Sequence, residues 1–199
     1  MAENIYKTIT QASEGLFKDK GSKFLAYAYP VSSEDDVKMR LEALRKEHHS
    51  ARHHCWAYKL GNEGERFRCS DDGEPSNSAG KPILGQLEAF GVTNVAVIVV
   101  RYFGGILLGV GGLMQAYKES AKDALTNAEI VEKVVQSYFT VTFTYEQNSS
   151  VLNVLKRYKC ETISQCFNET CEFRCAVSKS LSEECFDALQ KLNVIIKNE

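Results

Sequence analysis

The chain has 199 residues, 44% hydrophobic and 25% charged, which predicts an ordinary globular protein of one or two domains. Its formal net charge of -2 gives no overall basic field, so any contact with nucleic acid would need a local basic patch. No apolar run approaches the roughly 20 residues that cross a bilayer, and the first residues lack the apolar core of a signal peptide. We therefore expect a cytoplasmic protein with no membrane partner.

The seven cysteines are scattered and form no Cys-x-x-Cys pair, which predicts reduced thiols. Five of them follow residue 159, so a zinc site has to be considered. If residues 160–177 form a hairpin, Cys171 and Cys175 face one side, and Cys160 and Cys166 face the other. We therefore expect small buried side chains instead of zinc ligands, and we expect no metal and no cofactor.

The first two thirds of the chain mix strand and helix patterns. Ser33 and Asp36 form a capping-box start for one helix, and Ser78 is a candidate N-cap for the next. The strands at 5–9 and 23–29 are expected to form a simple hairpin across a polar loop at 11–21. The further expected elements are a helix at 33–47, strands at 53–60 and 66–69, a helix at 78–90, a strand at 94–100 and a helix at 113–128.

The stretch from Gly91 to Ala128 is expected to organise the rest. Asn94–Val100 is uncharged and rich in Val and Ile, which is typical of a strand covered on both faces. From Leu113 the apolar positions recur at helical spacing. Between strand and helix lie five glycines, which allow positive φ and close approach to a neighbour or a ligand: Gly104, Gly105, Gly109, Gly111 and Gly112.

A new unit begins near residue 135. A long strand at 134–145 carries Phe139, Val141 and Phe143 on one face, and a helix, the cysteine hairpin, a second helix and a final strand follow. This βαββαβ order is that of the ferredoxin-like split arrangement. We therefore predict an α+β protein with domains at 1–134 and 135–199.

Two features of the central stretch suggest an anion site. The glycines before the helix expose N–H groups at its positive end, near Gly109 to Leu113, although the same glycines also suit a tight connection. Arg101 ends the strand and can grip phosphate or carboxylate. The Arg101 guanidinium can equally form an ion pair with a carboxylate of the acidic turn, which carries Asp71, Asp72 and Glu74. Alternatively, these carboxylates can bind Mg²⁺.

Histidines and basic residues offer further candidates. Strand alternation sends His53 and His54 to opposite faces, so the histidines of this segment cannot all converge. Tyr102 and Phe103 can act as stacking groups beside a basic surface, with solvated charges as the alternative. The basic residues considered are Lys20, Lys23, Arg52, Arg66, Arg68 and Lys81.

Three segments together resemble the YigZ/IMPACT family. They are the strand and glycine loop at 91–109, the acidic turn at 70–75 with Ala79-Gly80-Lys81-Pro82, and the strand at 54–58. The family usually has Gly-Thr where this chain has Asn77-Ser78. The resemblance extends over the whole chain, because bacterial members pair this N-terminal Impact-type module with a ferredoxin-like C-terminal domain.

The resemblance implies a fold and a field of activity. The N-terminal domain would share the fold of a ribosomal protein domain and of domain IV of elongation factor G, and the C-terminal domain would resemble domain V. Eukaryotic relatives act in translational control by binding a regulator of a stress kinase. The ligand-binding residues expected from motif and pattern together are Lys23, His54, Asp71, Asp72, Glu74, Lys81, Arg101, Tyr102, Phe103, Gly104, Gly105, Gly109, Gly111 and Gly112.

Three functions follow as hypotheses. The first is a non-enzymatic binding protein in translation or its stress response, with RNA, the ribosome or a translation-control protein as partner and no DNA specificity. The second is an enzyme or binder of small phosphorylated metabolites or nucleotides that uses the glycine loop. The third is a protein-interaction adaptor. Fold kinship alone does not choose among them.

Overall fold

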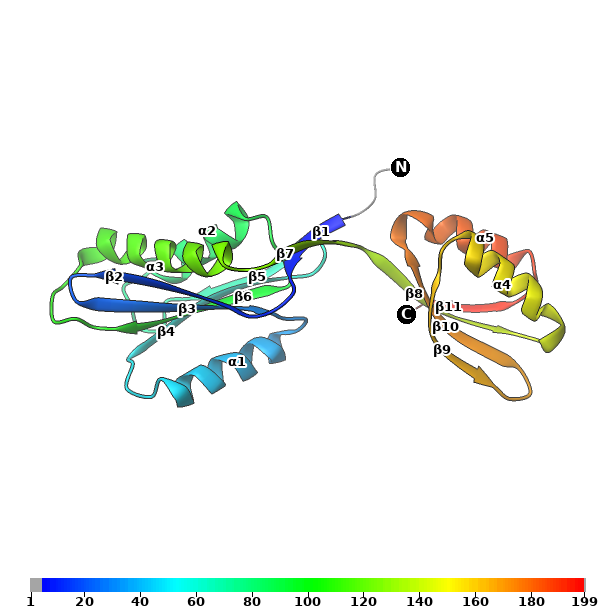
Figure 1. The fold of residues 1–199 in the computed structure, drawn as a ribbon, viewed down its shortest axis with the longest axis horizontal. Coiled ribbons are helices and arrows are strands. Elements are labelled where there is room, and N and C mark those ends of the chain that lie inside the picture. Colours follow the sequence, from blue (N-terminus) through cyan, green and yellow to red (C-terminus); the bar gives the residue numbers. More distant parts are fainter. Residues whose placement is uncertain (1–4, 199) are drawn as a thin grey trace. The chain divides into compact units, whose positions relative to one another are not determined.

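The computed structural model describes residues 5–198. It contains helices together with antiparallel sheets, which confirms the α+β class (Figure 1). The chain divides into two compact units, Tyr6–Lys133 and a smaller unit that starts at Val134. Among the described residues, no helix is long and apolar enough to span a bilayer.

The larger unit is built on a five-stranded sheet in the order β2-β3-β6-β4-β5, with every neighbouring pair antiparallel. Its strands are β2 (Ser13–Asp19), β3 (Ser22–Pro30), β4 (His53–Leu60), β5 (Arg66–Ser70) and β6 (Val95–Tyr102). Its helices are α1 (Glu34–Glu47), α2 (Gly80–Ala89) and α3 (Gly109–Thr126).

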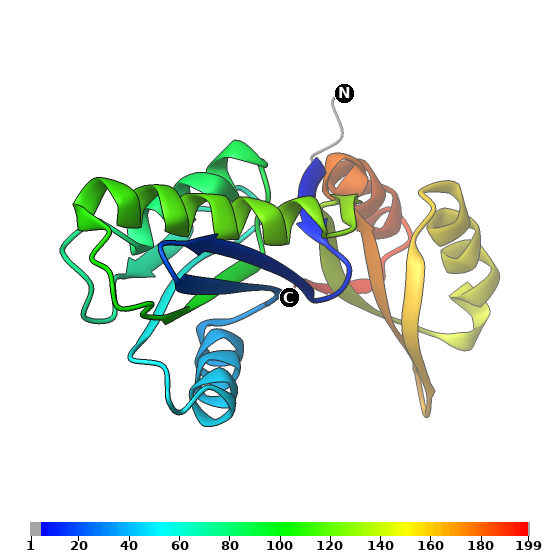
Figure 2. The same cartoon turned by 60° about the vertical axis from the view of Figure 1, so that its left-hand side comes forward.

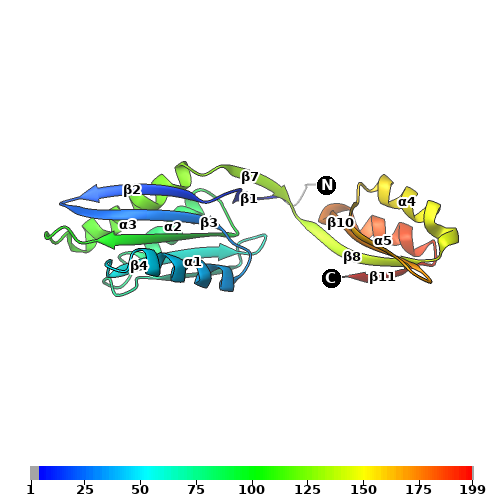
Figure 3. The same ribbon diagram turned by 60° about the horizontal axis from the view of Figure 1, so that its bottom comes forward.

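Strand β6 occupies the middle of this sheet, and its residues 95–100 are fully buried, so the predicted central strand is confirmed. Helices α2 and α3 cover one face, and α1 covers part of the other (Figures 1 and 3). Alternate residues of β6 point into the hydrophobic cores on the two faces of the sheet. Val97 and Val99 belong to the core under α2 and α3, and Ala96 belongs to the core on the α1 side. Burial on both faces explains why the strand carries no charge before Arg101.

The N-terminal hairpin prediction is wrong. Residues 13–19 form β2 and not a loop, because Lys20 and Gly21 make a two-residue turn with positive φ at both positions, and this turn pairs β2 with β3. Gly15 lets α3 approach closely, since a Cβ there would lie 2.3 Å from the backbone nitrogen of Ala124. The first strand, β1 (Ile5–Ile9), instead pairs with β7 (Ile130–Val134), more than 100 residues away in sequence.

The two helix starts illustrate local and non-local capping. Ser33 and Asp36 form the predicted capping box of α1. Ser78 does not cap α2, because its hydroxyl donates to the Pro75 carbonyl at 2.6 Å. The Asp71 carboxylate takes that role, as described below.

The smaller unit has the ferredoxin-like arrangement. Its four-stranded antiparallel sheet runs β11-β8-β10-β9, and two helices cover one face of it (Figure 2). Phe139, Val141 and Phe143 lie in the buried core of this unit. The elements are β8 (Gln136–Phe143), α4 (Asn148–Arg157), β9 (Glu161–Phe167), β10 (Cys171–Ser178), α5 (Ser182–Gln190) and β11 (Ile195–Asn198).

All seven cysteines are free thiols. Cys171 and Cys175 are buried and Cys166 is exposed, as the hairpin pattern predicts. Cys160 was expected to point away from the core, but its Sγ lies 3.6 Å from Sγ of Cys185. The reason is a β-bulge in β9. Arg174 pairs with Ser164 but Cys175 pairs with Thr162, so the side chains of the chain before the bulge face the opposite side from the one that simple alternation predicts.

Candidate functional site

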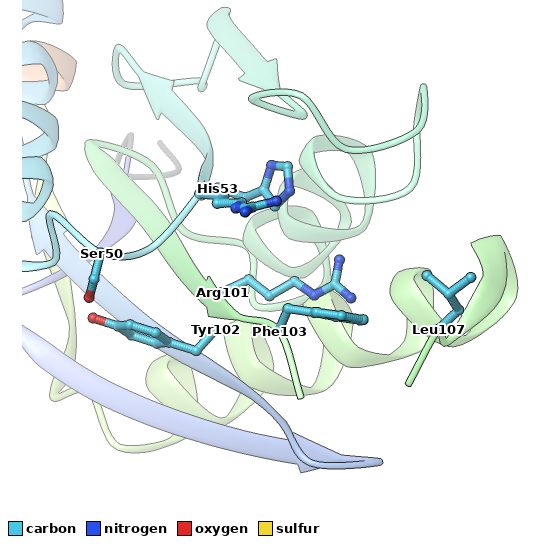
Figure 4. Close-up of a pocket in the computed structure, with 7 residues that line it drawn as sticks. Ser50, His53, Arg101, Tyr102, Phe103 and Leu107 are labelled. Atoms are coloured by element: carbon cyan, nitrogen blue, oxygen red, sulfur yellow. The ribbon is translucent and has the colours of Figure 1, made fainter. Parts of the chain in front are cut away.

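A cavity of about 620 Å³ opens where β6 ends beside the start of β4 (Figure 4). The antiparallel register aligns His53 with Arg101, which brings the segment before β4 next to the residues that follow β6. The lining residues are Ser50, Arg52, His53, Arg101, Tyr102, Phe103 and Leu107. Three of these were expected site residues: Arg101, Tyr102 and Phe103.

Arg101 is anchored inside the protein. Its Nη1 donates to Oε1 of Glu74 at 2.6 Å, and the two side chains are only 8% and 3% exposed. Its guanidinium lies 5.6 Å from the ring centroids of both Phe24 and Phe103. Its Nε is buried and has no hydrogen-bond partner among the described residues. Of the alternatives left open by the sequence, the structure therefore shows the ion pair, with one donor left unpaired.

Glu74 joins a buried network on the same side of the sheet. Tyr117 of α3 donates to Oε1 of Glu74 at 2.8 Å, and the Cys55 thiol donates to the Tyr117 hydroxyl at 3.3 Å. Burial raises the pKa of Cys55 and of Tyr117 well above their usual values, so both stay protonated. A thiol held in this state is a poor nucleophile.

The two aspartates of the turn are occupied by internal donors. Asp71 accepts from the backbone nitrogens of Ala79 and Gly80 at 3.0 and 2.8 Å, which caps α2, and from the nitrogen of Asn77. Asp72 accepts from the backbone nitrogen of His54 at 2.7 Å and from Arg45 at 2.8 Å. Their oxygens hold the turn, the start of α2 and strand β4 together.

The glycine loop packs tightly against the β2–β3 turn at Gly104, whereas the glycines that follow have open space around them. A Cβ on Gly104 would lie 1.9 Å from the carbonyl carbon of Gly21, so only glycine fits there, and the Gly104 nitrogen donates to the Ser22 hydroxyl. No Cβ contact within 4 Å restricts Gly105, Gly109 or Gly111. Helix α3 begins at Gly109, four residues before the predicted start, and none of these glycines lines the cavity.

Four expected residues lie outside the lining of this cavity. Lys23 is exposed on β3 directly opposite Tyr102 in the register, near the cavity but outside its lining. His54 is buried at 4% exposure, and burial lowers its pKa. Lys81 and Gly111 line a second cavity of about 650 Å³ between α2 and α3.

His48 positions the aromatic wall of the cavity, a role not predicted from the sequence. Its Nδ1 lies 2.9 Å from the Tyr102 hydroxyl, and its Nε2 lies 2.9 Å from the Tyr27 hydroxyl. A hydrogen bond to the acidic turn orients His53, because its Nδ1 lies 2.9 Å from the carbonyl oxygen of Asp72. A carbonyl only accepts, so Nδ1 of His53 carries a proton and the neutral ring presents Nε2 as an acceptor.

The six basic residues considered from the sequence do not form one surface. Arg68 lies 3.8 Å from Glu34 of α1, and Lys81 lies at the second cavity. Arg52 lines the first cavity, and the turn at Lys20 lies beside it because Gly21 packs on Gly104. Within residues 5–198, no group of three or more His, Cys, Asp or Glu side chains is arranged to hold a metal ion.

Residues 20–125 match the Impact N-terminal domain. The chain is 35% identical over 166 residues to an IMPACT family member of Haemophilus influenzae, which covers 82% of this chain and 81% of that protein. It is 41% identical over 96 residues to the human Protein IMPACT, or 46% of this chain and 29% of the human protein. A crystal structure of a hypothetical protein aligns with 98% of this chain and 97% of its own, at 28% identity and a TM-score of 0.74.

Proposed function

The chain is a member of the IMPACT family, as its motifs predicted, and we propose that it is a non-enzymatic protein that binds RNA in the control of translation. The family supports the regulatory setting, because the resemblance links its eukaryotic members to translational control. The chain spans only 29% of the human relative, so the RNA-binding part of the proposal is argued from the site.

The observation that carries this proposal is the meeting of cations and aromatic rings at one cavity. The cation Arg52 lines it from the segment before β4, and the rings of Tyr102 and Phe103 line it from the end of β6 and the loop that follows. Proteins that bind single strands of nucleic acid combine cationic groups along the backbone with rings on which bases stack. The cavity supplies both kinds of group beside the end of the central strand.

Local charge supports the same assignment despite the net charge of -2. Arg52, Lys20 and Lys23 form no ion pair with any residue between 5 and 198. Lys23 faces Tyr102 across the β3–β6 pair, and Lys20 sits in the adjoining turn. These three cations are free to neutralise phosphates along one edge of the cavity.

The metabolite-enzyme hypothesis gains less support. It needs phosphate at the start of α3 and carboxylates beside it that hold Mg²⁺. Asp71, Asp72 and Glu74 instead satisfy backbone nitrogens, Arg45, Arg101 and Tyr117. Freeing them for a metal would uncap α2 and leave a buried guanidinium unpaired, which is costly.

The adaptor hypothesis has one observation in its favour. The segment from Phe103 to the first turns of α3 exposes five large apolar side chains: Phe103, Ile106, Leu107, Val110 and Met114, at 45–82%. Exposed apolar clusters mark contact surfaces. We keep a protein partner as the second candidate for this loop.

Filter binding of labelled ribosomal RNA fragments at several salt concentrations tests the proposal. Affinity should fall steeply as salt rises, because phosphate contacts release counterions. Arg52→Gln should weaken binding and reduce the slope of log affinity against log salt by about one. Arg66→Gln is the matched control, since Arg66 is an exposed cation of the same sheet that does not line the cavity.

Two results would count against the proposal. The first is no retention of RNA at low salt. The second is binding that neither salt nor Arg52→Gln changes. Cross-linking in cells that captures a defined protein, with capture lost in Ile106→Ser and RNA absent, would instead favour the adaptor.

A further inference from the structure

We propose that the cavity beside β6 receives one unpaired base of RNA, so that the protein selects single-stranded over double-stranded RNA. This inference rests on the proposed RNA-binding function and adds the conformation of the RNA that the site accepts. Four features carry it: the size of the cavity, its exposed ring, the polar atoms of two lining residues and the cations beside it.

The cavity has the size of a small-molecule site. Its volume of about 620 Å³ falls within the range of about 300–1,000 Å³ that ligand pockets occupy. Its walls come from the segment before β4 and the first residue of β4, from the end of β6 and from the loop after β6 (Figure 4). A base inside a duplex is stacked on both faces and paired at its edge, so only an unpaired base can enter such a space.

Phe103 supplies the stacking surface. Its ring is 56% exposed at the cavity, and the Arg101 guanidinium lies 5.6 Å from the ring centroid. Arg101 is itself held by Glu74, so the ring rests against a fixed cation. Stacking on a ring tolerates any base, because every base has a π-face.

Two residues that line the cavity, Arg101 and His53, carry polar atoms suited to the edge of a base. Nε of Arg101 is a buried donor with no partner among the described residues, although the side chain is only 8% exposed. Buried donors are normally paired, so this atom marks a place where an acceptor belongs. His53 adds the complementary group, because its Nδ1 is committed to the Asp72 carbonyl and the neutral ring keeps an acceptor at Nε2. Base edges carry both donors and acceptors.

The phosphates on either side of the inserted base have cations within the same region. Arg52 lines the cavity, and Lys23 lies opposite Tyr102 on the neighbouring strand. Neither forms an ion pair with a described residue. The site therefore offers a ring, a donor, an acceptor and flanking positive charge.

The test compares three labelled oligonucleotides of one length with the full chain. They are a single strand without self-complementarity, the same strand annealed to its complement, and a single strand with abasic positions that keeps the phosphates. We expect the intact single strand to bind at least about tenfold more tightly than the other two, in line with the energy of base stacking.

Variants assign the preference to the cavity. Phe103→Ala should lower the affinity for the single strand about tenfold and so remove most of the preference for single-stranded RNA. Phe103→Trp should restore that preference. Phe67→Ala is the matched control, because Phe67 is also 56% exposed but lies on β5 outside the cavity. Circular dichroism of each variant checks that the fold is intact.

Each outcome decides between the two proposals. Salt-dependent binding that is equal for single strand, duplex and abasic strand would overturn the single-strand inference and leave RNA binding in place. A preference that Phe103→Ala does not change would place the base elsewhere and overturn it too. No binding of any of the three would overturn both.

Discussion

Arg101 and Glu74 form a buried ion pair with 2.6 Å between Nη1 and Oε1, and this pair ties the end of the central strand to the acidic turn. Breaking a buried pair by removing one partner leaves an uncompensated charge and costs about 3–5 kcal/mol. Arg101→Ala should therefore destabilise the larger unit by that amount.

Urea unfolding followed by the fluorescence of Trp56 measures this cost, because Trp56 is the single tryptophan and lies in the larger unit. Arg45→Ala is the control, since its pair with Asp72 is partly exposed, at 49% and 24%, and exposed pairs contribute about 1 kcal/mol or less. A loss below about 1 kcal/mol for Arg101→Ala would contradict a structural role and would favour a role of the guanidinium in ligand binding.

A second prediction concerns Asp71, which caps α2 from outside the helix. Because its carboxylate accepts from three backbone nitrogens, Asp71→Ala should cost about 2 kcal/mol, at the upper end for a lost cap. Ser78→Ala should cost less, since that hydroxyl binds only the Pro75 carbonyl. The same fluorescence assay compares the two. Equal losses would show that Asp71 has no special part in capping.

The pH dependence of stability should carry the signature of His54. Burial lowers the pKa of His54 below its usual 6.5, so the unfolded chain binds a proton more readily than the folded one. This contribution to stability is complete above about pH 6.5 and is lost as the pH falls through the lower, folded-state pKa. His54→Gln should flatten the loss of urea stability below that pH, whereas His49→Gln, at an exposed position, should not. An unchanged acid profile in His54→Gln would contradict the buried neutral state.

Thiol accessibility gives a test that needs no ligand. Cys69 and Cys166 are exposed, whereas Cys55, Cys171, Cys175 and Cys185 are buried and Cys160 is intermediate. A thiol-specific reagent should modify two cysteines rapidly in the native protein and all seven only after unfolding. Mass spectrometry of the peptides identifies the fast pair. Rapid labelling of Cys55 would contradict its burial, which raises its pKa.

Local patterns in the sequence predicted the elements whose residues contact near neighbours. The uncharged run of β6, the Ser33–Asp36 capping box and the inward face of β8 needed no knowledge of partners. Strand β2 was missed because its sequence, SEGLFKD, is polar and its turn begins with lysine, a residue seldom placed at positive φ. The pairing of β1 with β7 depends on contacts across the whole unit, which no local pattern reports.

The site shows the same division between local and non-local information. Arg101, Tyr102 and Phe103 follow one another at a strand end, so their grouping could be predicted. Ser50, Arg52 and His53 join them only because the register aligns His53 with Arg101. The acidic residues were placed in the right neighbourhood, but their use inside the fold depends on which backbone nitrogens the turn brings within reach.

The last prediction separates the two ends of the glycine loop. Gly104→Ala should destabilise the larger unit by more than about 1 kcal/mol, because its Cβ would lie 1.9 Å from a backbone carbon of Gly21 and the β2–β3 turn would have to move. Gly111→Ala should be neutral or stabilising by up to about 1 kcal/mol, since Gly111 lies in α3 with open space around it and alanine favours a helix. Urea unfolding compares the two variants. If both are tolerated, the contact between Gly104 and Gly21 does not govern the loop; if both are damaging, the first turn of α3 requires glycine for a reason other than packing.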